Sequence, residues 1–492
     1  MPSSKATVQP IIAPTPTPAS TRNLLLKWLV PVGIGIVLYL TPIPAGLPPS
    51  AWHFFALFAA TVAALMTEPV PSPAVGFIGV SAGASFILVG KTPVEAMRWA
   101  LAGFSNDTVW LIMAAAMFAL GYEKTGLGRR IALMLVRALG KRTLGLGYAI
   151  ALADLVLAPF MPSATARSGG TIYPVVKNIP PLYGSSPSEN PRKIGAYLCW
   201  TAFATACVTS SMFVTSLAPN LLAVELVKKI VHVDITWTSW MMGFLPTGII
   251  VFLVTPLLTY FIYSPEIKQG EQVAKWAAGE LVGMGPISRR EAIMAVLAVF
   301  ALLAWILGTR WMTATTVAAV VISLMVLTKV VDWSDIIANK QAWSVWVWFA
   351  TLVNMADGLN RVGFLSWFAN RSAAMLTGFP MIPMILALVV LFWVIHYCFA
   401  SATAHATAVL PVFLAMIVTV SGIPLKPVAL VLVYSLGIQG VISPYAHGAA
   451  PIWYSAGYIS TKDFWRLGAI TGAVYLLVLL LIGFPFLLRF MR

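Results

Sequence analysis

Two stretches of the chain carry the same four residues in the same setting. Residues 158–170 read APFMPSATARSGG, and residues 396–411 read HYCFASATAHATAVLP. The shared Ser-Ala-Thr-Ala occupies 163–166 and 401–404, an offset of 238 residues (401 − 163). Each string of small and hydroxyl residues interrupts a long apolar run. We therefore predict that a helix enters the membrane, breaks at this point and turns back, once in each half of the chain.

Further landmarks recur in nearly the same register, which indicates an internal duplication. Residues 108–110 read Thr-Val-Trp and residues 344–346 read Ser-Val-Trp, an offset of 236 (344 − 108). The apolar runs that begin there end at Gly126 and Gly363, an offset of 237 (363 − 126). A short string recurs easily by chance, but landmarks that agree in register do not. The sequence thus predicts two repeats.

Composition places this chain in a membrane. Its 492 residues are 59% apolar and 10% charged, whereas soluble proteins average roughly 45–50% apolar and about 25% charged residues. This difference excludes a soluble enzyme, a disordered chain and a nucleic-acid-binding module. The net charge of +15 comes from basic residues between apolar runs, which is typical of loops that orient a membrane protein. Cys199, Cys207 and Cys398 lie in apolar stretches, so we expect buried free thiols.

The apolar runs predict an all-α polytopic membrane protein with about 11 transmembrane helices, each long enough for a hydrocarbon core of roughly 30 Å. The candidate spans lie near residues 24–40, 51–66, 74–90, 108–122, 194–227, 239–263, 291–309, 312–330, 343–357, 427–447 and 466–488. The polar interruptions fall in two further apolar stretches, 145–176 and 380–420, which we interpret as re-entrant hairpins. Each repeat then holds five spanning helices and one hairpin.

Basic residues indicate that the two repeats are inverted. Segment 122–142 holds six Lys and Arg residues, and its counterpart 359–379 holds two. Because Lys and Arg favour the cytoplasmic side of a membrane, we expect the two segments on opposite faces. The five spanning helices of each repeat also predict inversion, because an odd number of crossings makes the second repeat start on the opposite side of the membrane. Inverted repeats are typical of secondary transporters, whose substrate site lies where the repeats meet.

The chain divides into four predicted parts. A Pro/Ser/Thr-rich tail at residues 1–22 is expected to be disordered, and residues 23–263 hold the first helix and the first repeat. A linker at 264–290 is expected on the cytoplasmic side, and residues 291–492 hold the second repeat. The expected location is the cell inner (plasma) membrane, with several passes through the lipid bilayer and a cytoplasmic N-terminus.

The two interruptions have the chemistry of an anion site. Hydroxyl groups and freed backbone N–H groups at a helix start donate hydrogen bonds to an anion, and small residues allow close approach. The candidate substrate-binding residues at the interruptions are Ser163, Ala164, Thr165, Ser401, Ala402 and Thr403. Two such tips facing each other would hold the two carboxylates of a short dicarboxylate. The alternative is that small residues only allow tight helix packing.

With these motifs, the chain resembles the divalent anion:sodium symporter family over roughly residues 28–492. The strings PSATARSGG and FASATAHATAVLP are most similar to its bacterial citrate/succinate antiporter and plastid 2-oxoglutarate/malate translocator branch. The resemblance adds Ser443 and Pro444, followed by Gly448, to the substrate-binding candidates, together with residues 216–220 in the first half. It also implies a homodimer with a fixed scaffold and a moving transport domain, which is an elevator-type mechanism.

One difference from the sodium-coupled members of the family concerns the tips. Those members carry Ser-Asn-Thr at both tips, and the resemblance implies that the Asn helps to build sodium sites. Here Ala164 and Ala402 stand instead, and Arg167 and His405 follow one turn later. We hypothesise that these two side chains supply the positive charge that sodium supplies elsewhere. The alternatives are a purely structural salt bridge from Arg167 to Asp154, and a neutral His405 hydrogen-bonded between helices.

The predicted function is secondary transport of small di- or tricarboxylates, such as malate, succinate, 2-oxoglutarate, citrate or tartrate, by sodium-independent exchange. The alternatives are a sodium-coupled dicarboxylate symporter and the membrane subunit of a carboxylate uptake system that needs a binding protein. An enzyme is not expected, since no P-loop, HExxH or CxxC spacing and no catalytic dyad is visible. No cofactor and no metal are expected.

Overall fold

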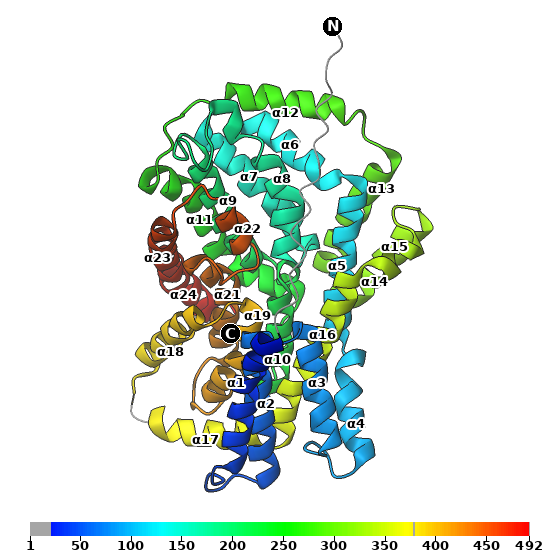
Figure 1. Ribbon diagram of the computed structural model, residues 1–492, viewed down its shortest axis with the longest axis vertical. Helices are drawn as coiled ribbons and strands as arrows, with labels where there is room; N and C mark the ends of the chain where they lie inside the picture. The colour runs from blue at the N-terminus through cyan, green and yellow to red at the C-terminus, as the bar shows by residue number, and fades with distance from the viewer. Residues whose placement is uncertain (1–20, 377–378, 492) are drawn as a thin grey trace.

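The computed structural model describes residues 21–376 and 379–491, and these residues form helices and connecting loops without a β-strand. A single isolated bridge joins Arg142 to Gln269. Most of the tail predicted at residues 1–22 lies outside the described residues, and Thr21 already begins helix α1. Figure 1 shows an elongated molecule with α6 and α12 at one end of its long axis and α2 and α17 toward the other.

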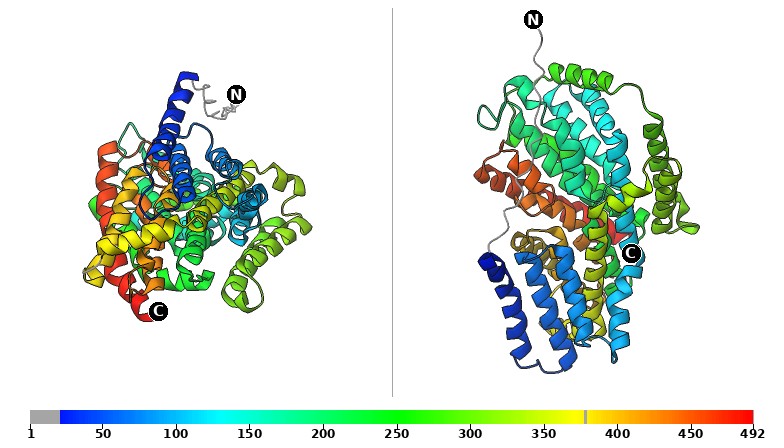
Figure 2. Two further views of the ribbon diagram at one scale, coloured as in Figure 1. Left: turned by 90° about the horizontal axis from the view of Figure 1, so that it is seen from below. Right: turned by 45° about the vertical axis from the view of Figure 1, so that its right-hand side comes forward.

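The first half of the chain forms eleven α-helices among the described residues. They are α1 (Thr21–Leu40), α2 (Pro49–Thr67), α3 (Ser72–Ser85), α4 (Pro93–Ala102), α5 (Asp107–Thr125), α6 (Leu127–Leu139), α7 (Thr143–Leu157), α8 (Tyr173–Val176), α9 (Gly195–Met212), α10 (Ala218–Val231) and α11 (Trp237–Ile262). Helix α1 packs against α2 at the edge of the molecule, as Figure 2 shows.

The second half continues the helical pattern. Its helices are α12 (Glu271–Gly283), α13 (Arg289–Leu307), α14 (Ala314–Leu327), α15 (Trp333–Ala338), α16 (Lys340–Arg361), α17 (Phe364–Leu376), α18 (Met381–Ile395), α19 (Ala402–Ala408), α20 (Leu410–Val418), α21 (Leu425–Ile438), α22 (Ala450–Ser455), α23 (Thr461–Val478) and α24 (Phe484–Phe490). The predicted linker at 264–290 therefore contains a helix, α12.

The all-α membrane architecture is confirmed by the length and composition of these helices. Among the described residues, 8 helical segments are long and apolar enough to cross a membrane, and three shorter apolar segments accompany them. Two predicted spans are not continuous. The run at 194–227 breaks between Met212 and Ala218, and the run at 427–447 leaves its α-helix after Ile438. Pro219, at the start of α10, fits a first helical turn but not a helix interior.

Both predicted hairpin segments consist of a helix, an irregular tip and a second helix. In the first, α7 ends in a 3₁₀ turn at Ala158–Phe160, and the chain re-enters helix after Ser163, with a π-helical stretch at Ala166–Ile172. In the second, α18 ends in a 3₁₀ turn at His396–Cys398 and α19 begins at Ala402. The sequence interruptions therefore coincide with backbone interruptions.

The amphipathic helix α6 turns the chain across one end of the molecule. Gly126 has φ +76°, a conformation that glycine adopts without strain, and it joins α5 directly to α6. Arg130 points inward and forms a buried ion pair with Glu291 of α13, with Nε to Oε1 at 2.6 Å. Its guanidinium also donates to the carbonyl oxygen of Gly285 at 3.0 Å. These contacts fix α6 to the segment that leads into the second half.

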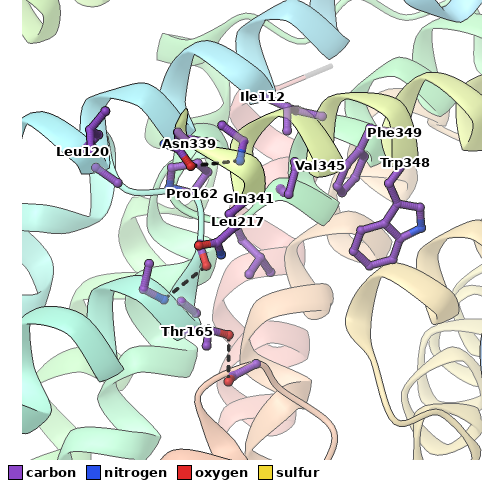
Figure 3. A pocket seen from close by; sticks show the side chains of 18 of the residues that line it. Ile112, Leu120, Pro162, Thr165, Leu217, Asn339, Gln341, Val345, Trp348 and Phe349 are labelled. Carbon is purple, nitrogen blue, oxygen red and sulfur yellow. Dashed lines mark hydrogen bonds between the residues drawn. The ribbon is translucent and has the colours of Figure 1, made fainter. Parts of the chain in front are cut away.

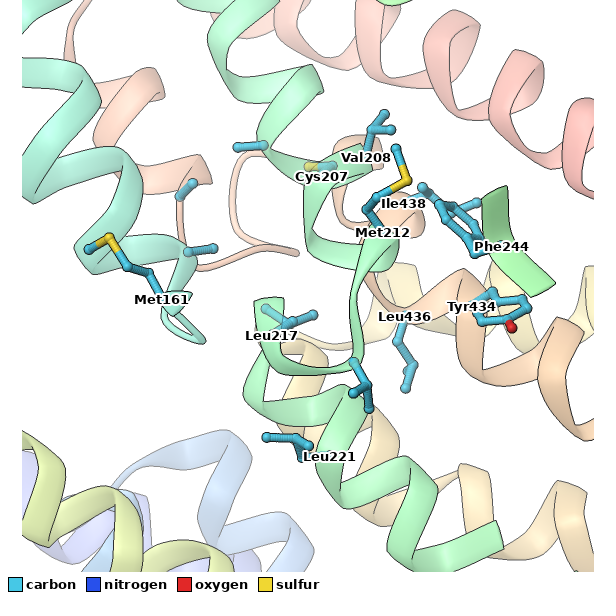
Figure 4. Close-up of a cluster of buried hydrophobic side chains, with 14 of the residues drawn as sticks. Met161, Cys207, Val208, Met212, Leu217, Leu221, Phe244, Tyr434, Leu436 and Ile438 are labelled. Carbon is cyan, nitrogen blue, oxygen red and sulfur yellow. The ribbon is translucent and has the colours of Figure 1, made fainter. Parts of the chain in front are cut away.

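Apolar side chains from α9, α11 and α21 fix the two helix breaks against each other. Val208 and Met212 of α9 lie beside Phe244 of α11 (Figure 4), whose ring centroid is 5.1 Å from that of Tyr434 in α21. In a membrane such contacts depend on close packing and hydrogen bonds, since lipid is as apolar as the side chains. The breaks are therefore placed by a rigid helical core.

The cysteine prediction is wrong at one position. Cys199 and Cys207 are buried thiols in α9, but Cys398 is exposed. Cys398 ends the 3₁₀ turn that precedes the second tip, and it lies in a run in which Leu391 and Val394 are exposed as well. All three cysteines are free.

Candidate functional site

The two Ser-Ala-Thr tips meet at one cavity of about 510 Å³, which we call the central cavity (Figure 3). The first tip, residues 163–165, and the second tip, residues 401–403, both line it. The remaining walls come largely from α5, the start of α10 and α16, and include Ile112, Ala116, Leu217, Ala342, Val345, Trp348 and Phe349. The fold thus brings together six predicted site residues, which form two triplets 238 positions apart in the sequence.

The first tip is held by its own hydroxyl groups. Ser163 Oγ accepts a hydrogen bond from the N–H of Ala166 at 3.2 Å, as a helix-capping serine does. Thr165 Oγ1 donates to the carbonyl oxygen of Gly448 at 2.9 Å. The N–H of Ala218, at the start of α10, donates to the carbonyl oxygen of Pro162 at 3.0 Å. The tip is therefore connected to both helix breaks.

The second tip has a similar local arrangement. Ser401 Oγ accepts from the N–H of Thr403 at 3.2 Å, and Thr407 Oγ1 donates to the carbonyl oxygen of Thr403 at 2.8 Å. The side chain of Thr403 is almost fully buried, whereas Thr165 of the first tip is exposed to the cavity. The two tips thus offer the same residue types with different accessibility.

Arg167 lies behind the first tip and does not line the cavity. Its fully buried guanidinium donates to the carbonyl oxygen of Met161 at 2.8 Å and to that of Ser216 at 2.9 Å. Those carbonyls belong to the tip and to the α9–α10 break, so one cation holds both. Its Nε also pairs with Asp154 Oδ2 at 3.0 Å. Further contacts are Thr209, Ser210 and Ala206.

His405 occupies the corresponding place behind the second tip, but its surroundings differ. The ring is buried, and Nδ1 accepts a hydrogen bond from the amide of Gln439 at 2.8 Å. Its Nε2 has no partner among the described residues. The ring packs against Phe392 at 4.3 Å and His396 at 4.8 Å between centroids. Unlike Arg167, this side chain has no ion pair or hydrogen bond with a carboxylate of the residues that the structure describes.

The predicted residues Ser443 and Pro444 do not line the cavity. Ser443 is buried, and its Oγ accepts from the N–H groups of Tyr445 at 3.4 Å and Ala446 at 3.0 Å. It therefore shapes the loop after α21. The residues of this loop that reach the cavity are His447 and Gly448. Ser443 thus positions the loop that forms the cavity wall.

Sequence reasoning missed His447, although a signal was present. His447 follows Ser443 by four positions, the spacing that separates Ser163 from Arg167 and Ser401 from His405. Its Nδ1 accepts from the N–H of Ala449 at 3.4 Å, so Nε2 carries the proton and donates to Ser210 Oγ at 3.2 Å. Ser210 also accepts from Arg167 at 3.1 Å. Ser210 thereby connects the cavity wall to the Arg167 network.

The cavity extends toward the end of the molecule that carries α6. Glu123, Lys124 and Asp335 line it there. Lys124 Nζ and Asp335 Oδ1 lie 2.8 Å apart, and this ammonium group holds the pKa of the Asp335 carboxyl below its usual value. Exposed pairs of this kind contribute little to stability.

Comparison with known proteins agrees with this geometry. Residues 22–489 match the family model described as sodium:sulfate symporter transmembrane region. The chain is 45% identical over 479 residues to a citrate/succinate antiporter of Escherichia coli K12, which covers 95% of this chain and 98% of the relative. It is 42% identical over 470 residues to an L-tartrate/succinate antiporter of Shigella sonnei, which covers 93% and 96%.

A solved structure supports the fold alone. The YdaH transporter of Alcanivorax borkumensis aligns over 96% of this chain and 97% of its own, with a TM-score of 0.54 and 14% identity. The family match spans nearly the whole chain and agrees with the family predicted from the hairpin motifs. The chain therefore belongs to the sodium:sulfate symporter family, the divalent anion:sodium symporters.

Proposed function

We propose that this protein exchanges small di- or tricarboxylates across the membrane without sodium. The observation that carries the proposal is the meeting of both Ser-Ala-Thr tips at one cavity. The cavity volume of about 510 Å³ is within the range of small-molecule sites, roughly 300–1,000 Å³. The relatives named citrate/succinate and L-tartrate/succinate antiporters support the same reaction class.

Each tip would hold one carboxylate of the substrate. Ser163, Thr165, Ser401 and Thr403 supply hydroxyl groups, while Ala164 and Ala402 leave room next to the backbone. Hydrogen bonds to a charged acceptor contribute more than neutral ones, roughly 1.5–3 kcal/mol each. His447 and Gly448 close the wall beside the first tip. The apolar side of the cavity, with Trp348 and Phe349, would face the carbon chain of the substrate.

Arg167 supports a sodium-independent mechanism. It lies where two backbone carbonyl oxygens converge, those of Met161 and Ser216, at 2.8 and 2.9 Å. Carbonyl oxygens are typical ligands of a hard cation, so the guanidinium occupies a place suited to a metal ion. We propose that Arg167 acts as the fixed substitute for that ion, with His405 at the corresponding place in the second half. Sodium-coupled symport and a binding-protein-dependent system are the competing outcomes.

We also propose an inverted repeat, an elevator-type movement of one domain, a homodimer, and an inner-membrane location with a cytoplasmic N-terminus. Support for inversion comes from α6 and α17, which follow the two repeated spans and lie at opposite ends of the molecule (Figure 1). Basic residues are concentrated near α6, as the side facing the cytoplasm requires.

Removing one hydroxyl from either tip tests the substrate site. We expect Thr165→Val and Thr403→Val each to weaken succinate binding about tenfold or more, because a lost hydrogen bond costs on the order of 1–3 kcal/mol. Isothermal titration of the purified proteins with succinate measures the change. Thr238→Val, at a threonine that donates to the carbonyl of Trp305 instead, is the matched control. Normal affinity in both tip variants would show that the tips are not the site.

Labelling from two sides tests the inverted repeat. Single cysteines replacing Lys141 and Arg371, which are both exposed, should react with a membrane-impermeant maleimide from opposite sides of the membrane. The exposed Cys398 is first changed to serine so that it does not contribute signal. Labelling of both positions from the same side contradicts the inverted arrangement and the site built on it.

A further inference from the structure

Two buried histidines behind the second tip have complementary unused atoms. His396 and His405 are both 0% exposed, and their ring centroids lie 4.8 Å apart with an interplanar angle of 44°. One ring nitrogen of each has no partner among the described residues, Nδ1 of His396 and Nε2 of His405. Buried nitrogen atoms are rarely left unpaired without a reason. Each ring can therefore form one more hydrogen bond than the described contacts show.

The partners of the other two nitrogens decide which atoms carry protons. His396 Nε2 faces the carbonyl oxygen of Ala446 at 3.1 Å, so it must carry a proton, and Nδ1 is a bare acceptor in the neutral ring. His405 Nδ1 faces the Gln439 amide nitrogen at 2.8 Å, so it accepts, and Nε2 carries the proton. The unused groups are thus a donor on His405 and an acceptor on its neighbour His396.

The same surroundings can accommodate one additional proton after a local rearrangement of side chains. If the Gln439 amide rotates by half a turn, its oxygen accepts from a protonated Nδ1 of His405, and its nitrogen donates to Ser435 Oγ, now 3.2 Å from Oε1. The Ser435 hydroxyl already donates to the carbonyl oxygen of Leu432 at 2.7 Å. The bare Nδ1 of His396 is the complementary acceptor for His405 Nε2–H, but the two atoms are not hydrogen-bonded in the structure, although the ring centroids lie only 4.8 Å apart. The amide rotation together with a shift of the two rings would therefore make His405 a satisfied imidazolium.

We propose that the His396–His405 pair is a proton-binding site and that His405 takes up one proton from water when a carboxylate binds at the second tip. This inference rests on the proposed function and deepens it. Proton uptake gives the neutral pair one positive charge. This charge lies close to the second tip, because Ser401 precedes His405 by only four residues. In the first half the permanent charge of Arg167 occupies the corresponding position. The second half thus has a reversible charge where the first has a fixed one.

Within the described part of the chain, no carboxylate pairs with either ring. Helices α2, α10, α20 and α21 pack against α19. Their ionisable side chains are His53, Glu225, Lys228, Lys229, Lys426 and Tyr434, and none has a hydrogen bond or ion pair to either imidazole among the contacts of the described residues. On the adjoining loop, His447 interacts electrostatically with His396 and with Arg167. A bound substrate carboxylate is therefore the counter-charge that a protonated His405 lacks.

Proton uptake on binding tests the inference. Succinate is titrated into the full chain in lipid nanodiscs at several pH values between about 6.5 and about 8, where its carboxyl groups are largely ionised. Repeating the titration in buffers with different ionisation enthalpies gives the number of protons taken up for each succinate bound. We expect uptake above zero and at most one proton, with affinity falling up to tenfold for each pH unit where uptake is complete.

Variants assign the proton to the pair. His405→Gln and His396→Gln should lose the uptake, whereas His53→Gln, at a ring that stacks on Tyr39 instead, should keep it. The unchanged protein is informative alone, since binding without proton uptake across this pH range overturns the inference even if a variant does not fold. Uptake that persists in folded His405→Gln also overturns it. Absence of any carboxylate binding would instead reject the proposed function.

Discussion

Replacing Arg167 with alanine is expected to abolish exchange, reducing the rate by more than about a hundredfold. The substitution removes the cation that joins the carbonyl oxygens of Met161 and Ser216, and it leaves Asp154 as a buried carboxylate without its partner. Breaking a buried ion pair in this way also costs roughly 3–5 kcal/mol of folding stability, so the amount of folded variant must be matched to that of the unchanged protein. Exchange of labelled succinate in vesicles with matched amounts of folded protein measures the loss.

A double variant separates the two roles that Arg167 can have. In Arg167→Ala with Asp154→Ala, no unpaired carboxylate remains, so folding should be largely recovered. If Arg167 substitutes for a coupled cation, the double variant stays inactive, because nothing holds the tip and the α9–α10 break together. If Arg167 only neutralises Asp154, exchange returns with the fold. The second result would leave Arg167 as a structural partner.

The parts of the fold that follow from local composition were predictable. Apolar length placed most spans, and the interruptions at Ser163 and Ser401 placed both tips, since hydroxyl and small residues in an apolar run mark a helix break wherever it lies. The convergence of the two tips on one cavity was expected from the predicted repeat. Local patterns were sufficient for the spans and for each tip because each of these is contained in a single segment.

Features that depend on side-chain direction were not predictable. The sequence offered Arg167 either as a substitute for sodium or as a salt-bridge partner of Asp154, and only the structure shows that its guanidinium turns away from the cavity toward Asp154 and backbone carbonyls. His447 reaches the cavity although Ser443, four residues earlier, does not. No binding motif in the sequence marks the walls from α5 and α16, so only tertiary packing identifies residues such as Trp348 as part of the site.

A buried Arg167 without a partner would leave an unpaired charge in the empty carrier and slow its crossing, which would favour obligate exchange. Asp154 lies 3.0 Å from Arg167, and an ionised pair carries no net charge, so obligate exchange needs another physical reason. The empty tips nevertheless expose hydroxyl and N–H groups that need water or a ligand. Moving such groups through a low-dielectric region without partners costs several kcal/mol. A bound carboxylate satisfies them, which makes crossing easier in the loaded state.

Vesicles loaded with succinate are therefore expected to take up labelled succinate much faster than empty vesicles, on the order of a hundredfold, because a few kcal/mol separate the loaded and empty crossings. The rate should be unchanged when sodium is replaced by choline, since Arg167 already occupies the carbonyl-lined place behind the first tip. Protein-free vesicles are the control for leakage. Fast, sodium-stimulated uptake into empty vesicles would contradict exchange and support a symporter, and a requirement for an added binding protein would support the multi-component uptake system.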